Sequence, residues 1–352
     1  MIKTLISSSI LTLALTTTVS AATQLRYAEG SPNRGARADA VFHMIEDVKK
    51  LSGGELTFDT HWGGALLNYK SMVGGVAGGT ADMGTMLAAY DPKKLRSLTI
   101  GDIPTAYSDP WVGTRAMYEL MSTNKDMQKL LADQGFVYLT GFSTTGAQFE
   151  CAGDKQIRSI ADIKGKRMRA VGNFAKILDD LGANLINLNI SDAYQAYDTG
   201  LVDCGASYFY TIRAFKTFEV ASNYTIANWG QLLGFATLMN IDIWNDLSPE
   251  HQAVLQKAGS NAVDYAAKLQ IEEMELVVDG LRTGSIGKKA ELYELPEEDR
   301  SALDVAAEKY VQEWIDQANQ DGVDGQSIWN EFKALLAKYQ EEKDSKGYPW
   351  QR

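Results

Sequence analysis

The stretch IRSIADIKGKRMR, residues 157–169, leads from a polar turn into a short segment of alternating polarity. Alternation over residues 167–171 predicts a β-strand, in which successive side chains point to opposite faces of the sheet. Arg167 and Arg169 therefore share one face, and Met168 between them points to the other. The stretch predicts a strand that presents two guanidinium groups on one side.

The same strand-and-helix pattern continues on both sides of this stretch. Glycines such as Gly53, Gly182 and Gly200 follow the helical segments, as is typical of helix ends, and Asp109-Pro110 has the form of a helix start. The alternation predicts an α/β fold with mostly parallel sheets. The expected strands are residues 24–28, 56–62, 81–87, 136–149, 167–171 and 202–207, and the expected helices are residues 36–51, 69–77, 174–181 and 193–199.

The order of elements changes in the last third of the chain. An apolar strand is expected at residues 232–241, and Ser248-Pro249 begins a helix without a breaker up to about Gly280. At 1.5 Å per residue this helix would be about 48 Å long, enough to lie across two lobes. Two further amphipathic helices are expected at residues 297–319 and 326–343, and the charged end at residues 341–352 is expected to be loose.

The amino terminus has the pattern of a secretory signal. Lys3 precedes an apolar run at residues 5–19, and Val19-Ser20-Ala21 supplies the small residues that a signal peptidase recognises. The run is too short and too rich in hydroxyl groups for a stable membrane span. We expect residues 1–21 to be removed and a periplasmic protein, without a lipid anchor, to begin at Ala22.

Length and charge restrict the organisation and the partners. The 331 residues that follow residue 21 exceed what one hydrophobic core usually organises, so two lobes are expected. We assign residues 22–146 and 235–274 to lobe I and residues 147–234 and 275–352 to lobe II. The net charge of −11 argues against nucleic acid or an anionic membrane surface as a partner. A monomer is expected.

The chain has two cysteines, Cys151 and Cys204. In an oxidising compartment this number fits one disulfide or two buried thiols. Because both cysteines fall in the expected second lobe, near the same sheet, we predict that they form a disulfide.

Several segments resemble the solute-binding proteins of tripartite ATP-independent periplasmic (TRAP) transporters, the DctP family. Residues 157–169 resemble the family's I-R-S-x-x-D-hydrophobic-K-G-x-K-hydrophobic-R motif. Residues 193–203 resemble its Y-x-A-L-x-x-G-V-V-D-G run, and residues 52–56 and 78–83 resemble its S-G-G-x-hydrophobic and G-x-x-D-M signatures. Residues 244–256 resemble its W-x-x-L-s-x-x-x-Q helix start. The resemblance covers nearly the whole chain after residue 21.

This resemblance implies two α/β lobes, two strand crossovers between them, a helix spanning both lobes, and closure on a ligand. It implies an organic acid as ligand, membrane permease subunits as partners and no cofactor, and it implies that Arg169 holds the ligand carboxylate. The sequence departs from the family pattern at Cys204, where glycine is usual, and at Gln148-Phe149-Glu150-Cys151.

The position of Arg169 supports this role independently. Ligands of parallel sheets sit beyond the carboxyl ends of the strands, and Arg169 is about 6.6 Å nearer that end than Arg167. A guanidinium offers paired donors that match the two oxygens of a carboxylate or sulfonate. From spacing alone, a solvated surface arginine is the alternative.

Other candidate ligand contacts follow predicted strands. The Tyr208-Phe209-Tyr210 run stands at a strand's carboxyl end and is expected to send at least one ring into the pocket. For any single aromatic residue, a place in the core is the alternative. The full set of expected aromatic contacts is Trp62, Tyr90, Tyr208, Tyr210 and Trp229. Ser31 and Asn33, after the first strand, are expected at the opposite edge, with an ordinary turn as the alternative.

Glu150 leaves the class of ligand open. A carboxylate close to Arg169 would either neutralise the arginine or bind the amine of a zwitterionic ligand. Alternation along residues 144–150 places Gln148 on the same face as Glu150, so the two are expected to line the pocket together.

Two other classes of protein are alternatives. The histidines His43, His61 and His251 are widely separated, and the sequence has no metalloprotease, nucleophile-elbow, phosphate-loop or dinucleotide motif, which argues against a periplasmic α/β enzyme. A binding protein of the ABC type is the nearer alternative, and the long helix and the order of motifs favour the TRAP family.

Overall fold

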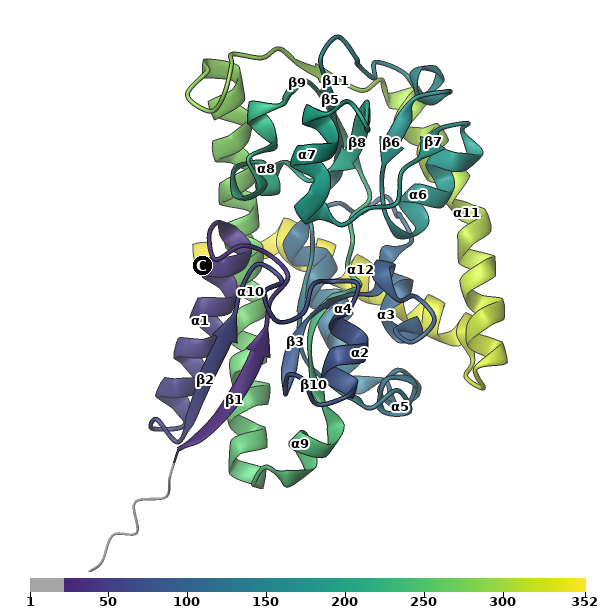
Figure 1. Ribbon diagram of the computed structural model, residues 1–352. Helices are drawn as coiled ribbons and strands as arrows, with labels where there is room; N and C mark the ends of the chain where they lie inside the picture. Colours follow the sequence, from purple (N-terminus) through teal and green to yellow (C-terminus); the bar gives the residue numbers. More distant parts are fainter. Residues whose placement is uncertain (1–21) are drawn as a thin grey trace, which may run out of the picture.

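The computed structural model describes residues 22–352, so the predicted signal at residues 1–21 lies outside the described part. The chain forms two β-sheets, each with its own helices (Figure 1). We call the first sheet and its helices lobe I, and the second sheet and its helices lobe II. This two-lobed α/β arrangement confirms the predicted fold class.

The first sheet has the strand order β2-β1-β3-β10-β4. β1 pairs in parallel with β2 and β3, whereas β10 runs antiparallel to both of its neighbours. The strand bounds are β1 Thr23–Ala28, β2 Leu56–His61, β3 Met83–Leu87, β4 Phe136–Phe142 and β10 Phe235–Asn240.

The second sheet has the order β11-β9-β5-β8-β6-β7. Here β5 is antiparallel to both neighbours, and the other pairs are parallel. The bounds are β5 Ala147–Ala152, β6 Arg167–Arg169, β7 Asn184–Leu185, β8 Cys204–Ser207, β9 Ala221–Trp229 and β11 Leu292–Glu294. In each sheet the antiparallel pairs are those of the strand that enters from the other lobe, β10 in the first sheet and β5 in the second, and the remaining pairs are parallel.

The prediction of one strand over residues 136–149 is wrong, because the chain changes sheets within it. β4 ends in the first sheet, residues 143–146 cross between the lobes, and β5 begins in the second. A second crossover, residues 230–234, runs back from β9 to β10. The crossovers lie side by side, since the backbone N–H of Thr144 donates to the carbonyl of Leu232 at 2.9 Å. In each crossover segment the strand pairing of one sheet ends before the pairing of the other sheet begins.

Helices cover the sheets of both lobes. Asp109 caps α4 as predicted, because its Oδ1 accepts from the backbone N–H groups of Trp111 and Val112. The helices of lobe I are α1 Ala36–Leu51, α2 Met72–Ala77, α3 Arg96–Thr99, α4 Pro110–Thr123, α5 Lys125–Ala132 and α9 Ile241–Asp246, and those of lobe II are α6 Gly172–Asp180, α7 Ala193–Asp198 and α8 Ile212–Phe215.

The long helix α10, Pro249–Thr283, runs alongside both sheets (Figure 1). Its first half buries residues such as Ala262 in the core of lobe I, and its second half buries Val277 and Leu281 in the core of lobe II. At 1.5 Å per residue its 35 residues extend about 52 Å. The helix passes the predicted end at Gly280 and stops before Gly284, whose φ of 83° suits glycine.

Two further helices complete the fold, α11 (Glu297–Gln320) and α12 (Gly325–Lys346). α11 begins on the core of lobe II with Leu303 and ends on the core of lobe I with Ala318. α12 packs its Phe332 into the same core as α4. The lobe boundaries remain a prediction, and this packing favours moving α12 from lobe II to lobe I.

The expectation of a loose carboxyl terminus is wrong. The hydroxyl of Tyr348 donates to Oδ2 of Asp109 at 2.6 Å, and its ring stacks on that of Trp350. Arg352 bonds to Glu342 and places its guanidinium over the ring of Trp111. These contacts form because α12 continues to Lys346 and brings the last residues back to the start of α4. Within residues 22–352, no helix combines the length and apolar character needed to cross a membrane.

Candidate functional site

Arg169 lies at the boundary between the lobes. It ends β6, is 5% exposed, and its Nη2 donates to the hydroxyl of Tyr90 in lobe I at 3.0 Å. Its Nε is buried and has no partner among the described residues. Arg167, by contrast, lies at the surface and bonds through Nη2 to Oδ1 of Asp203 at 2.6 Å. Arg169 is therefore buried at the lobe boundary, whereas Arg167 is exposed and paired with Asp203.

Tyr90 links three parts of this boundary. It ends the short 3-10 turn Ala88–Tyr90 that follows β3, and its hydroxyl also accepts from the backbone N–H of Ile190 at 3.3 Å. Its ring stacks on that of Tyr69, with centroids 5.9 Å apart and planes 4° from parallel. Gly30 allows Tyr69 to come this deep, because a Cβ at that position would lie 2.8 Å from the tyrosine ring.

Glu150 lines a small cavity together with Arg169. The glutamate stands in the middle of β5, is 3% exposed, and accepts a hydrogen bond from the hydroxyl of Thr217 at 3.0 Å. Burial raises the pKa of Glu150, while the hydroxyls of Ser207, Thr217 and Tyr197 and the charge of Arg169 act in the opposite direction. The charge of Arg169 is thus one of the influences that favour the charged form of Glu150, and burial outweighs them.

Gln148 has different surroundings from Glu150, although alternation predicted that they act together. Its Oε1 accepts from the backbone N–H groups of Ala227 and Asn228, and its Nε2 donates to the side chain of Asn228. These bonds tie β5 to β9 where their register is irregular. Gln148 is fully buried and is not among the residues that line the cavity.

The predicted aromatic residues divide between the lobe boundary and the cores. Tyr210 accepts from Nε of Arg37 in lobe I at 2.8 Å, and Tyr208 is also buried. Trp229 packs edge-on against Phe174, and its indole N–H has no partner among the described residues. Trp62 packs against Phe42 on α1.

The loop after β1 contains one predicted residue that faces inward. Ser31 is buried and donates from both its backbone N–H and its hydroxyl to Oε1 of Glu29. Asn33 is exposed. The predicted serine therefore supports a buried carboxylate that the sequence analysis did not select.

Sequence reasoning missed Glu29, Arg37 and Tyr69, which lie together at the edge of lobe I. The hydroxyl of Tyr69 donates to Oε1 of Glu29 at 2.7 Å, and the guanidinium of Arg37 lies 4.7 Å from the ring of Phe235. Two signals were available in the sequence. Glu29 directly follows the first predicted strand, and Arg37 has the spacing of the buried face of its helix, which continues at Val41, Met44 and Val48.

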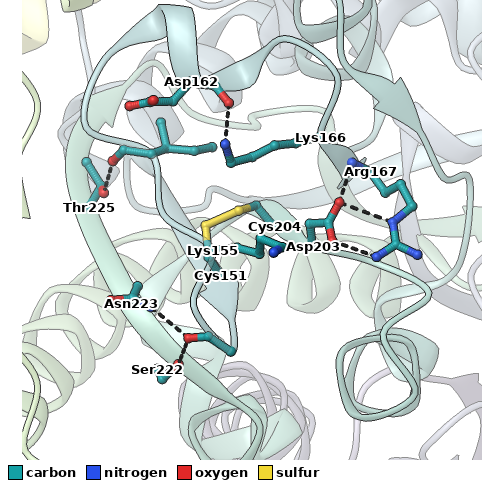
Figure 2. The surroundings of a disulfide bond; sticks show 12 residues. Cys151, Lys155, Asp162, Lys166, Arg167, Asp203, Cys204, Ser222, Asn223 and Thr225 are labelled. Carbon is teal, nitrogen blue, oxygen red and sulfur yellow. Dashed lines mark hydrogen bonds and ion pairs between the residues drawn. A yellow bond between two sulfur atoms is a disulfide. The ribbon is translucent and has the colours of Figure 1, made fainter.

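The structure contains the predicted disulfide between Cys151 and Cys204 (Figure 2). The two residues face each other across β5 and β8 and are fully buried. The next pair in this register, Glu150 and Gly205, adjoins Arg169, which is paired with Gly205. The bond therefore fastens two strands that carry the site. No group of three or more potential metal ligands occurs in the described part of the chain.

The curated relatives align with most of the chain. The chain is 23% identical over 283 residues to the 2,3-diketo-L-gulonate-binding periplasmic protein YiaO of Escherichia coli. This alignment covers 78% of this chain and 83% of the relative. It is 25% identical over 268 residues to the C4-dicarboxylate-binding periplasmic protein DctP of Rhodobacter capsulatus, covering 73% and 76%.

Solved structures agree with the fold. A TRAP solute-binding protein of Rhodoferax ferrireducens in complex with copurified benzoate superimposes with a TM-score of 0.79 at 18% identity, covering 91% of this chain and 99% of the other. A TRAP periplasmic solute-binding protein of Sulfitobacter with bound β-D-galacturonate gives 0.75 at 21% identity, covering 89% and 100%. The sequence profile "Bacterial extracellular solute-binding protein, family 7" (DctP) matches residues 29–317, and the chain therefore belongs to this family of TRAP transporter solute-binding proteins.

Proposed function

We propose that this protein captures a small organic acid between its lobes in the periplasm and delivers it to the membrane permease subunits of a TRAP transporter. The observation that carries the proposal is the guanidinium of Arg169, which is buried at the lobe boundary and keeps its Nε–H without a partner among residues 22–352. A buried cationic donor of this kind is stabilised by an anionic acceptor. We expect a monomer that binds its ligand without converting it.

The relatives support a carboxylate as the anionic group. Two of the related proteins above are named for binding diketogulonate and C4-dicarboxylates, and the other two hold benzoate and galacturonate; all of these ligands carry a carboxylate. A guanidinium suits a carboxylate better than an ammonium group does, because its planar fork donates to both oxygens.

Lobe closure is supported by contacts that join the lobes around Arg169. Nε of Arg34 donates to the carbonyl of Ala214 at 2.9 Å, and Arg37 bonds to Tyr210. These bonds would break if the lobes moved apart about the crossovers at residues 143–146 and 230–234. X-ray scattering with and without saturating ligand measures this motion, and identical profiles would contradict it.

The binding test starts from a thermal-shift screen of carboxylates, sulfonates and small amines, followed by calorimetry of the best ligand. Arg169→Ala is expected to weaken binding about a hundredfold or more, because it removes charge-assisted hydrogen bonds of about 1.5–3 kcal/mol each. Arg169→Lys is expected to restore little, because lysine lacks the planar fork.

Arg167→Ala is the matched control, since it removes an arginine from the same strand that bonds to Asp203 at the surface. Its affinity is expected to remain close to that of the wild type. Equal affinity in Arg169→Ala and in the wild type would contradict the proposal. Conversion of any test compound to product would favour an enzyme instead.

A small amine or zwitterion bound by Glu150 is the second candidate, because Glu150 lines the same cavity as Arg169. Two observations make it the weaker one: Thr217 already donates to this carboxylate, and burial raises its pKa. Binding of an amine that survives in Arg169→Ala and is lost in Glu150→Gln would favour this candidate.

A further inference from the structure

Two buried side chains of lobe I each keep one polar atom without a partner among residues 22–352. Oε1 of Glu29 accepts three hydrogen bonds, from the backbone N–H and hydroxyl of Ser31 and from the hydroxyl of Tyr69, but Oε2 accepts none. Nε of Arg37 donates to Tyr210, but Nη1 donates to no atom. Glu29 is 1% exposed and Arg37 is 6% exposed. Buried charged groups normally complete their hydrogen bonds, so both atoms point to a ligand.

Glu29 and Arg37 belong to the same boundary as Arg169. Tyr69, which bonds to Glu29, stacks on Tyr90, which bonds to Arg169. Arg37 donates to Tyr210, which follows β8, and Gly205 of the same strand is paired with Arg169. A ligand held by Arg169 can therefore also extend towards Glu29 and Arg37.

The two free atoms require opposite hydrogen-bonding partners. Oε2 of Glu29 requires a donor, and Nη1 of Arg37 requires an acceptor. A hydroxyl group is both at once. An ammonium group donates to Glu29 but offers no acceptor to Arg37 and is repelled by its charge, whereas a bare hydrocarbon leaves both atoms unsatisfied.

We propose that the ligand is a hydroxy acid, whose carboxylate binds Arg169 and whose hydroxyl donates to Oε2 of Glu29 and accepts from Nη1 of Arg37. This inference rests on the proposed function and narrows the class of organic acid. A site built to bind a hydroxyl discriminates strongly against an analogue that lacks it, because its own polar groups then remain unpaired.

The test compares acids that differ in one group on the same carbon. Three sets carry hydroxyl, hydrogen or ammonium: mandelate, phenylacetate and phenylglycine; malate, succinate and aspartate; lactate, propionate and alanine. Gluconate and 2-deoxygluconate form a fourth pair. Calorimetry on the wild type is expected to show, in at least one set, that the hydroxy acid binds tenfold or more tightly than its counterparts.

Glu29→Gln is expected to reduce this hydroxyl preference to less than threefold, as measured by the ratio of the two affinities in the variant. Glu46→Gln, an exposed change on α1, is the matched control and should keep the preference. If Glu29→Gln does not fold, the ratios measured on the wild type still decide the question.

The outcomes separate this inference from the proposed function. Binding of the counterpart acids as tightly as the hydroxy acids in every set overturns the inference, because water then satisfies Glu29 and Arg37, and leaves the proposed function standing. Tighter binding of the amino acids overturns it in favour of an ammonium group at Glu29. Failure of every acid in these sets to bind overturns the inference, and failure of all carboxylates in the wider screen overturns the proposed function as well.

Discussion

Nη2 of Arg169 in lobe II donates to the hydroxyl of Tyr90 in lobe I over 3.0 Å, although the residues are 79 positions apart in the chain. The same hydroxyl accepts from the backbone N–H of Ile190, also in lobe II. One tyrosine oxygen thus joins the lobes and orients the guanidinium at the proposed ligand site.

Tyr90→Phe removes this oxygen and leaves two donors of lobe II without their acceptor. Because Arg169 is then no longer oriented, we expect the dissociation constant for a bound carboxylate to rise about tenfold, which corresponds to the 1–2 kcal/mol of one such bond. Calorimetry measures the change. Tyr107→Phe, at a partly buried tyrosine elsewhere in lobe I, should bind normally. Unchanged affinity in Tyr90→Phe would show that Tyr90 has no part in orienting Arg169.

The disulfide between Cys151 and Cys204 spans 53 positions of the chain. Replacing both cysteines with alanine is expected to lower the free energy of unfolding by about 4 kcal/mol, because the unfolded chain gains the freedom of an open loop. Urea denaturation measures this difference, with wild-type protein unfolded in reductant as the matched comparison. Free thiols in the unreduced, unfolded wild type would contradict the bond.

The buried carboxyl of Asp102 is expected to make the free energy of unfolding depend on pH. The residue is 2% exposed beside the second crossover, where the backbone N–H of Gly234 donates to Oδ1 at 2.8 Å, and burial raises its pKa from 3.8 to about 7. At a pH between these two pKa values, Asp102 keeps its proton in the folded protein but has lost it in the unfolded chain. The contribution of Asp102 to the free energy of unfolding therefore falls as pH rises from about 4 to about 7, by up to about 1.4 kcal/mol per unit, and changes little above that.

Asp102→Asn keeps an acceptor for Gly234 but cannot ionise. We expect its stability relative to the wild type to increase from pH 4 to pH 7 and then to level off, as measured by denaturation at each pH. The exposed change Asp126→Asn should show no such trend over this window. A constant difference between Asp102→Asn and the wild type would mean that Asp102 titrates alike in the folded and unfolded states.

The last residues are expected to contribute to stability. Ending the chain at Gly347 removes the hydrogen bond from Tyr348 to Asp109 and uncovers the ring of Trp111. We expect a loss of about 1–3 kcal/mol in the free energy of unfolding and no change in ligand affinity, because these residues pack on α4 and not at the lobe boundary. Tyr348→Phe, which removes only the hydroxyl, should lose about 1 kcal/mol. If the shortened protein is as stable as the wild type, the residues after Gly347 do not contribute to stability.

The sequence by itself determined most of the elements and the pairing of the cysteines. Helix α1 occupies the predicted residues, Asp109 caps α4, and the long helix follows Ser248-Pro249, because amphipathic periodicity and capping groups act within a few residues of one another. The sequence also distinguished Arg169 from Arg167, since position along a strand decides which side chain is nearer its carboxyl end.

Only the tertiary structure decided which distant residues meet. Residues 136–149 form two strands because β4 pairs in the first sheet and β5 in the second, and this pairing with distant strands decides where each strand ends. The surroundings of Gln148 and Glu150 differ because one faces an irregular stretch of β9 and the other faces Thr217, which strand alternation cannot anticipate. Glu29 and Arg37 become candidate ligand contacts only when burial leaves one atom of each without a partner, and burial is a property of the folded chain.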